Sequence, residues 1–509
     1  MSNLIYPNLF LFLYDLREGL GEDQEDLAKN QRIFAAKFPE YLRQSLFNRD
    51  TAFESEYLEL LANQIEKFPD SDKPYEGYYY PVRINDTYGL LLACSLPNNI
   101  TPHPASCFAN LKAKIEEKLN GQLATLGQSW LIFAQLANPK SNLEETVKNC
   151  SQALNLGLNW ERDLQGQGCL LGGTLFELQR YQLLMQDSSQ KNASAPTLEQ
   201  IQQSQHLIIA LYPDATAAQK AAALNFDWLR LFSYRHKILW AYAQSRYLKH
   251  QLKKDSTEIK QFAVSINSES LKRLRRSIVE TQKILPQYSI NLTAIGDQIR
   301  TIEVNLLNYN RRLKTLTERV SQIQVKAGDD YPSKLLPNVI FSWLQSVATS
   351  SVDAGANPSA LLAQLGNWQH QCDLKFLEKF SDDVAKKYQL QVQKDYEKLS
   401  PDLQLLQDLI NSSRAITEID QAQRDRNFQN TVGILGAGLA VGSIVASIEI
   451  PTKNDNFLNP PLKLALSTLH IPDTWLPFAI RITFSLSAAI AAGAFTAALI
   501  WLRQRWPKR

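Results

Sequence analysis

The sequence has few of the residues from which metal sites and disulfide frameworks are built. Its 509 residues include five cysteines and six histidines. The cysteine count is odd and no pair has C-x-x-C spacing, which argues against both a disulfide framework and a zinc site. The histidines do not stand in H-E-x-x-H or other ligand spacing. We therefore expect reduced, buried thiols and neither a bound metal nor another cofactor.

The sequence also lacks the short motifs of common catalytic and nucleotide-binding sites. It has no G-x-x-x-x-G-K-[ST] loop and no G-x-S-x-G elbow. The glycines of residues 166–172 follow G-x-G-x-x-x-G spacing, but no apolar strand precedes them. We interpret them as a turn that enters a strand. No residue is predicted to be catalytic, and we expect that the chain is not an enzyme.

An excess of charge of one sign is missing as well. The chain has 54 Lys and Arg against 51 Asp and Glu, a formal net charge of +3. This balance argues against a nucleic-acid partner. The length is too great for one hydrophobic core and indicates several structural units.

The patterns that are present predict a mainly α fold, beginning with an α/β domain with a small sheet over residues 1–255. Residues 75–95 are rich in aromatic and β-branched residues around a turn at Asn85-Asp86, which predicts a β-hairpin. Further strand regions are expected at 166–177 and 206–211, and helices at 104–119, 123–137 and 142–154. His236 lies in a helix rich in aromatic residues and is predicted to be packed rather than a ligand.

A heptad repeat follows and predicts a coiled coil over residues 256–330. Pro286 is expected to kink or split this long helix. Two alternatives stay open: the apolar seam packs on its own chain, or it joins copies into a homo-oligomer. Among the seam positions are Leu271, Leu274, Ile278, Leu292, Ile299, Leu306, Leu313 and Leu316.

Residues 331–430 are predicted to form a helical stalk, and residues 431–509 a two-helix transmembrane domain. Residues 432–448 and 482–502 carry no charge and reach the length that a bilayer requires. The basic residues flanking both segments predict that both termini are cytoplasmic. A buried pair of core helices is the alternative.

Small residues in these two segments predict close helix packing, because glycine lets helix backbones approach. The packing could lie within one chain or join copies of the chain, and both alternatives stay open. The glycines concerned are Gly433, Gly436, Gly438, Gly442 and Gly493.

The order of these parts resembles the CorA-type divalent-cation transporters. The resemblance covers the α/β domain of residues 1–255, the stalk and first membrane segment at 402–448, the second at 482–502, and the basic tail at 503–509. It implies an oligomeric cation channel. The family's Gly-Met-Asn signature is absent, since the two methionines are Met1 and Met185, so no ion-binding residue is carried over.

Two functions are therefore expected from the sequence. The first is an integral membrane protein whose large cytoplasmic helical domain is a non-enzymatic scaffold, sensor or partner-binding module, with membrane lipid and an unidentified protein as partners. The alternative is a CorA-like oligomeric divalent-cation transporter or channel. A ring of subunits would favour the channel, and a monomer or dimer would favour the scaffold.

Overall fold

A computed structural model of the chain describes residues 3–19, 24–50, 55–97, 101–139, 141–183, 202–265, 271–325 and 373–422. The chain divides into two compact units. Unit 1 comprises Met1–Leu252 and Ile290–Leu399, and unit 2 comprises Lys253–Ser289 and Ser400–Arg509.

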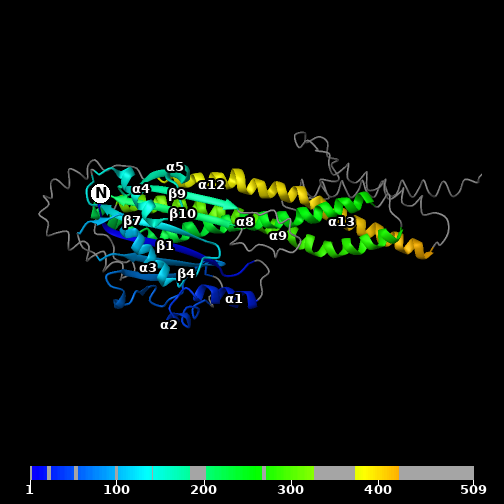
Figure 1. Ribbon diagram of the computed structural model, residues 1–509, viewed down its shortest axis with the longest axis horizontal. Coiled ribbons are helices and arrows are strands. Elements are labelled where there is room, and N and C mark those ends of the chain that lie inside the picture. Colours follow the sequence, from blue (N-terminus) through cyan, green and yellow to red (C-terminus); the bar gives the residue numbers. More distant parts are fainter. Residues whose placement is uncertain are drawn as a thin grey trace, which may run out of the picture. The chain divides into compact units, whose positions relative to one another are not determined.

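Unit 1 is built on one mixed sheet of ten strands (Figure 1). Eight of them follow the order β2-β4-β5-β1-β7-β10-β9-β8, while β3 pairs with β4 and β6 pairs with β1. The central strand β1 is antiparallel to both neighbours, and β7 and β10 are parallel. The strands are β1 (Asn3–Leu16), β2 (Tyr57–Glu59), β3 (Glu66–Lys67), β4 (Glu76–Ile84), β5 (Thr87–Ser95), β6 (His103–Pro104), β7 (Gly127–Leu136), β8 (Leu164–Leu170), β9 (Gly173–Leu183) and β10 (Gln202–Tyr212).

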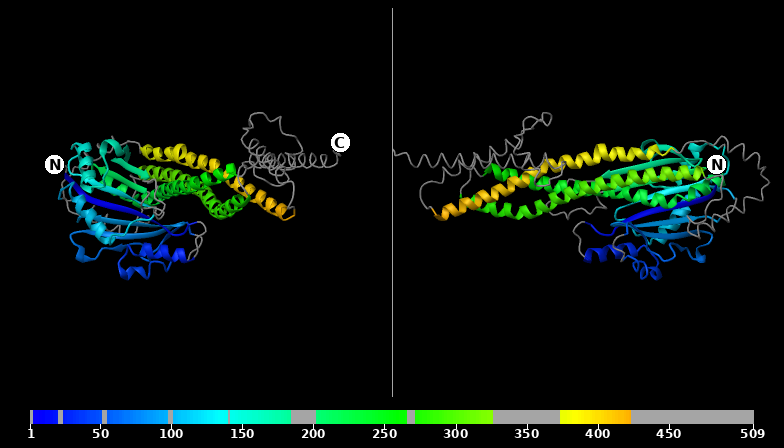
Figure 2. Two further views of the ribbon diagram at one scale, coloured as in Figure 1. Left: turned by 45° about the vertical axis from the view of Figure 1, so that its right-hand side comes forward. Right: turned by 180° about the vertical axis from the view of Figure 1, so that it is seen from behind.

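Helices pack on both faces of this sheet. On one face α1, α2, α3 and α4 enclose an apolar core, to which Phe34, Phe108 and Val147 contribute. On the other face α8 lies along the strands (Figure 2). Its Phe232 meets Phe12 of β1 edge to face at 5.4 Å. The helices of the described residues are α1 (Gln24–Ala35), α2 (Glu40–Arg43), α3 (Cys107–Lys118), α4 (Leu143–Leu154), α5 (Trp160–Asp163), α7 (Ala215–Ala222), α8 (Asn225–Ser265), α9 (Leu271–Val325), α12 (Lys375–Asp383) and α13 (Leu390–Ala422), with a 3-10 turn η1 (Asp70–Asp72) and a π-helix η4 (Val384–Gln389).

The sheet corrects the predicted fold class. A mainly α chain with a small sheet is wrong, because ten strands form one sheet across unit 1. The prediction failed at β7, where a helix was expected over residues 123–137. The strand is buried on both faces, so it reads as a continuous apolar run that periodicity does not distinguish from a buried helix. The predicted hairpin at 75–95 is confirmed as β4 and β5.

The membrane prediction is also corrected. Within the described ranges, no helix combines the length and the apolar character needed to cross a bilayer, since charged residues recur along α8, α9 and α13. The prediction of a two-pass membrane protein with cytoplasmic termini is therefore wrong for the chain as the structure describes it. Residues 432–448 and 482–502, which motivated it, lie outside the described residues, as do the five glycines assigned to helix packing.

The heptad segment forms the single helix α9, which continues through Pro286. Within unit 1 its seam is covered by the same chain: Leu292, Leu313 and Leu316 are buried, while Ile299 and Leu306 are half-buried. The Tyr309 hydroxyl donates to the backbone oxygen of Leu377 at the start of α12. This part of the seam therefore packs on its own chain, and self-association of the chain stays a prediction.

Unit 2 is helical over its described residues, which belong to α8, α9 and α13. Its Asp402 is buried and accepts hydrogen bonds from the Ser256 hydroxyl at 2.6 Å and the Lys260 ammonium at 3.0 Å. These contacts join α8 to α13 within the unit. Leu271, Leu274 and Ile278 belong to this part of α9, and their side chains are outside the description.

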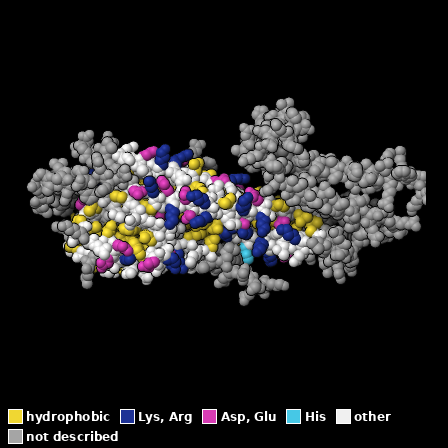
Figure 3. All heavy atoms as spheres, turned by 90° about the horizontal axis from the view of Figure 1, so that it is seen from above, with side chains coloured by type: hydrophobic (Ala, Val, Ile, Leu, Met, Phe, Trp, Pro, Cys, Tyr) yellow, Lys and Arg dark blue, Asp and Glu magenta, His cyan; other side chains and the backbone are white. Residues whose placement is uncertain are grey.

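Charged side chains of both signs lie among one another on the molecular face that Figure 3 displays. Many of them pair along a helix, as Lys386 does with Asp382 at 2.7 Å and Lys387 with Asp383 at 2.7 Å. Such pairs between exposed groups contribute little to stability. They cover the helices with polar groups of balanced sign.

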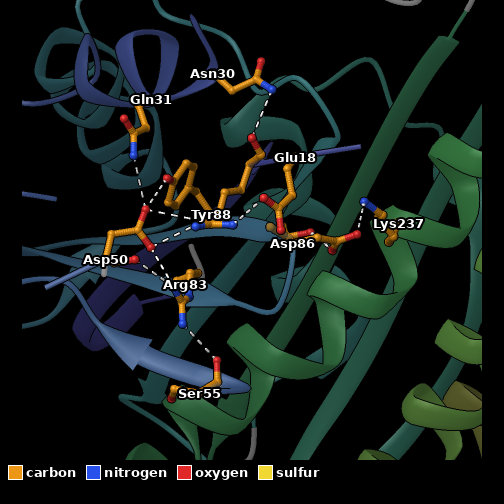
Figure 4. Close-up of polar contacts among 11 residues, drawn as sticks. Glu18, Asn30, Gln31, Asp50, Ser55, Arg83, Asp86, Tyr88 and Lys237 are labelled. Carbon is orange, nitrogen blue, oxygen red and sulfur yellow. Dashed lines mark hydrogen bonds and ion pairs between the residues drawn. The ribbon is translucent and has the colours of Figure 1, made fainter. Parts of the chain in front are cut away.

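A buried carboxylate fastens α1 and the strand β5 together at one end of the sheet (Figure 4). Asp50 accepts from Arg83 at 2.9 Å, from the Tyr88 hydroxyl at 2.7 Å and from Gln31 of α1 at 3.3 Å. Arg17, which follows β1, lies 3.4 Å from the same carboxylate. Asp50 is thus satisfied by hydrogen bonds as well as by charge, which a buried ion requires.

Asp50→Asn should strongly destabilise unit 1, because it leaves the buried Arg83 without its charge partner. We expect the free energy of unfolding to fall by about 3–5 kcal/mol, the usual effect of breaking a buried ion pair. Urea unfolding followed by circular dichroism measures it. Asp70→Asn is the matched control, since Asp70 is 95% exposed and pairs only with an exposed lysine. Equal stability of Asp50→Asn and the wild type would contradict the role assigned to Asp50.

Candidate functional site

Three neighbouring strands each place one polar side chain on the sheet face that α8 covers. These side chains are Ser129 of β7, His206 of β10 and Glu177 of β9, and each is at most 3% exposed. The register brings them together, because β10 lies between β7 and β9. The surrounding residues on this face are apolar, so a polar group here needs a hydrogen-bonding partner.

The three side chains form a continuous chain of hydrogen bonds that α8 completes. Ser129 Oγ lies 2.6 Å from His206 Nδ1 and 2.7 Å from His236 Nε2, and His206 Nε2 lies 3.1 Å from Glu177 Oε1. One serine hydroxyl therefore joins a histidine of the sheet to a histidine of the helix. A hydroxyl donates once and accepts, so the two histidines must present opposite roles to it.

His236 is the last member of this hydrogen-bonded chain and lies against Gly127, the first residue of β7. Its ring stacks on Tyr14 at 5.4 Å, and its Nδ1 is buried without a hydrogen-bond partner among the described residues. Gly127 has φ +148°, and a Cβ there would collide with His236 Nδ1. Glycine is thus required at this position for the histidine to approach the strand. His236 is packed in the core, as predicted.

Arg235, next to His236 on α8, is the unusual member of the site. The side chain is 1% exposed, yet its Nε, Nη1 and Nη2 atoms have no hydrogen-bond acceptor within the part of the chain that the structure describes. Its nearest anion is Glu177, with 4.0 Å between Nη2 and Oε1. Its guanidinium carbon lies 4.4 Å from the centre of the Phe380 ring. A buried guanidinium with five N–H donors and no acceptor is costly.

Aromatic side chains from five elements form a connected cluster that reaches Arg235 through Phe380. Tyr242 of α8 stacks on Tyr388 at 4.4 Å, and Tyr181 of β9 lies 6.1 Å from Tyr388. Tyr309 of α9 meets Phe380 of α12 at 5.2 Å. Tyr388 belongs to the π-helix η4, a rare conformation that is frequent at functional sites.

Burial controls the protonation of the site. It raises the pKa of Glu177 to about 6, against the opposing charges of Arg235 and Lys379. It depresses the pKa of His206 and of His236 well below the usual range, and the Arg235 charge adds to both effects. The two histidines are therefore neutral at neutral pH, while the carboxyl of Glu177 titrates close to it.

Sequence reasoning did not assemble this site. The residues predicted as functional were the seam leucines and isoleucines, which pack α9, and the five glycines outside the described residues. Ser129, Glu177 and Arg235 come from segments far apart in the chain. The available signal was a polar residue at a position of an apolar strand whose side chain shares a face with buried residues. His206 is such a residue, because Ile208 and Ala210 follow it at intervals of two.

The site has no arrangement for a metal ion. Across the residues with a described placement, no group of three or more His, Cys, Asp or Glu side chains could hold one. The glycines at 166 and 168 serve packing, since a Cβ at Gly166 would lie 2.7 Å from the Cβ of Phe376. They allow α12 to lie close to β8.

No protein-family model matches the sequence, and neither a curated protein nor a solved structure similar to it was found. The resemblance to the CorA-type transporters is therefore wrong on two findings. The sheet has ten strands, and no helix of the described residues could cross a membrane. A shared order of parts was its basis, and such an order does not specify a fold or a site.

Lowering the pH from 7 to 5 should destabilise unit 1 through the two histidines. Below their ordinary pKa of 6.5 the unfolded chain binds protons that the folded chain does not, so stability present above pH 6.5 is lost as pH falls. Glu177 opposes this loss between its ordinary pKa of 4.5 and about 6, because there the folded state holds the extra proton. The stability lost through the two histidines exceeds the stability gained through the single carboxyl.

The variant His236→Gln isolates this effect, because the amide keeps a donor for Ser129 and does not titrate. Its loss of unfolding free energy should be smaller than that of the wild type by about 1.4 kcal/mol per pH unit below 6.5. Urea unfolding at pH 7, 6 and 5 measures the difference. Parallel pH profiles for the two proteins would show that His236 is protonated when folded.

Proposed function

We propose that unit 1 binds a small carboxylate at the Arg235 guanidinium, and that the chain acts through this binding rather than as an enzyme. The observation that carries the proposal is that three buried nitrogen atoms of Arg235 have no hydrogen-bond acceptor among the residues that the structure describes. The other buried arginines contrast with it. Arg83 lies 2.9 Å from Asp50, and Arg246 lies 2.5 Å from Asp395.

The chemistry of the guanidinium selects the ligand class. Its planar fork matches the two oxygens of a carboxylate and forms two parallel hydrogen bonds with it. Glu177 lies 4.0 Å away and already compensates part of the Arg235 charge. A doubly charged phosphate or sulfate would therefore bring an excess of negative charge into a buried site, whereas a monocarboxylate brings one charge.

The surroundings favour a small ligand with little polarity beyond its carboxylate. Phe380, Tyr242 and Tyr388 present ring surfaces near Arg235, and aromatic rings pack well on apolar and planar groups. Tyr388 lies in the π-helix η4, which interrupts the α-helical bonding between α12 and α13. We propose that the ligand reaches Arg235 when this segment moves.

Acyl transfer is the competing function, because Ser129, His206 and Glu177 have the residue types and the order of a catalytic triad. The distances of 2.6 and 3.1 Å also fit a triad. Two features oppose it: Ser129 is 0% exposed, and its hydroxyl is engaged by a second histidine, His236. A nucleophile needs an open path to the substrate carbonyl, so we assign these residues to binding.

A fluorophosphonate that labels activated serines should leave the native chain unmodified. Incubation at pH 7.5 followed by intact-mass spectrometry measures labelling, with trypsin as the positive control. Labelling that is lost in Ser129→Ala would contradict the binding assignment and favour the hydrolase.

Formate, the smallest planar carboxylate, should stabilise the wild-type chain and not Arg235→Met. A ligand at about a hundred times its Kd stabilises the folded state by about 2.7 kcal/mol, which raises the Tm by several degrees. The measurement is thermal unfolding in 0–100 mM sodium formate, with ionic strength held constant by sodium sulfate. The Tm of Arg235→Lys should rise only slightly with formate, because lysine keeps the positive charge but lacks the two parallel N–H donors of the guanidinium.

Arg246→Met is the matched control for this experiment. Arg246 is also a buried arginine of α8, but Asp395 already accepts its hydrogen bonds. This variant should have a lower Tm and the same increase with formate as the wild type. An equal response of Arg235→Met and the wild type would refute the site.

A further inference from the structure

The hydrogen-bonded chain beside Arg235 connects the buried carboxyl of Glu177 to the start of the interior strand β7. From Glu177 it passes through His206 and Ser129 to His236, with donor–acceptor distances of 3.1, 2.6 and 2.7 Å. His236 Nδ1, the last atom, lies beneath Gly127, and Gly127 is partly exposed. Four titratable or hydroxyl groups thus form a hydrogen-bonded path through the core, which ends at a buried ring nitrogen beneath a partly exposed glycine.

The hydrogen-bonded chain from Glu177 to His236 has two complete proton arrangements. With Glu177 ionised, His206 Nε2–H donates to the carboxylate, the Ser129 hydroxyl donates to His206 Nδ1, and His236 Nε2–H donates to Ser129. Every bond is reversed when Glu177 is protonated: its O–H donates to His206 Nε2, His206 Nδ1–H to Ser129, and Ser129 to His236 Nε2.

The second arrangement contains one more proton than the first. A proton that arrives at His236 Nδ1 releases the Nε2 proton to Ser129, which passes its own to His206 Nδ1. His206 then gives its Nε2 proton to Glu177. One N–H bond forms at His236 Nδ1 and one O–H bond forms at Glu177. His236, Ser129 and His206 each lose one proton as they gain another.

We propose that this hydrogen-bonded chain is a proton wire that protonates Glu177 when a carboxylate binds to Arg235. Unit 1 then takes up one proton with each anion and in effect binds a weak acid. This inference rests on the proposed function. The 4.0 Å between Arg235 and Glu177 supports it, because Glu177 and a bound carboxylate would otherwise be two negative charges beside one buried guanidinium.

The charges that face Glu177 fit this exchange. Arg235 of α8 and Lys379 of α12 favour its ionised form, while Tyr309 of α9 and His206 of β10 are neutral groups beside it. An arriving carboxylate neutralises Arg235 and so removes the largest of the favourable charges. Burial already brings the pKa of Glu177 to about 6, and uptake of one full proton between pH 7 and pH 8 requires the bound carboxylate to raise this pKa well above 8.

Calorimetric titration of the full chain with sodium formate tests the coupling. At pH 7, titrations in buffers of different ionisation enthalpy should show about one proton taken up per formate. Between pH 7 and pH 8 the Kd should rise about tenfold, because each binding event consumes one proton. Glu177→Gln carries a permanently neutral amide, so it should bind formate with the same Kd at both pH values and take up no proton.

The outcomes separate the two proposals. Absence of formate binding at both pH values would overturn the proposed function and the coupling together. Binding by the wild type with equal Kd at pH 7 and pH 8 and no proton uptake would overturn the coupling alone.

Ser129→Ala tests the wire itself, because a methyl group cannot pass a proton. After rapid mixing with formate in weakly buffered indicator solution, this variant should take up the same number of protons at least tenfold more slowly than the wild type. Thr146→Ala is the control, since Thr146 is also buried but lies on α4 at the opposite sheet face. An unchanged rate in Ser129→Ala would overturn the wire.

Discussion

The hydroxyl of Ser129, shared between a histidine of the sheet and a histidine of α8, is the contact on which the arrangement of unit 1 depends. Helix α8 brings Arg235 and His236 to the sheet at 1% and 0% exposure, a costly position for polar groups. Only strands that offer hydrogen-bonding partners can accept such a helix. Ser129 supplies one for His236, so this polar contact fixes where along the sheet α8 lies, while Arg235 has no acceptor among the described residues.

The two faces of the sheet consequently have different roles. The face beneath α1 to α4 is closed by apolar side chains and gives the unit its hydrophobic core. The face beneath α8 combines apolar packing with the polar chain and the aromatic cluster. A strand between two such layers carries both kinds of side chain in alternation, as β10 does with Leu207 on one face and His206 on the other.

Buried charges elsewhere in unit 1 follow a consistent rule, which makes Arg235 informative. Asp50 is surrounded by donors, Asp395 joins Arg246 and Lys249, and Asp227 of α8 pairs with Arg319 of α9. Each of these groups fastens one element to another. Arg235 faces a carboxylate at 4.0 Å and an aromatic ring, without a hydrogen bond to either. Among these described buried ions, this exception is the observation on which the proposed carboxylate site rests.

The sequence by itself determined the local elements that have a distinctive period or turn. Aromatic and β-branched residues around the turn at Asn85-Asp86 predicted β4 and β5. The heptads predicted the helix α9, but the structure has it as one helix through Pro286, where a kink or a split was expected. The sequence did not determine the sheet, because β1 and β7 are buried on both faces and have no period that separates strand from helix. The tertiary structure alone decided the site: the register of three strands and the seating of one helix bring Ser129, Glu177 and Arg235 together from positions 48 and 58 residues apart. Local sequence patterns report which residues neighbour one another along the chain, whereas hydrogen bonding and charge act through space.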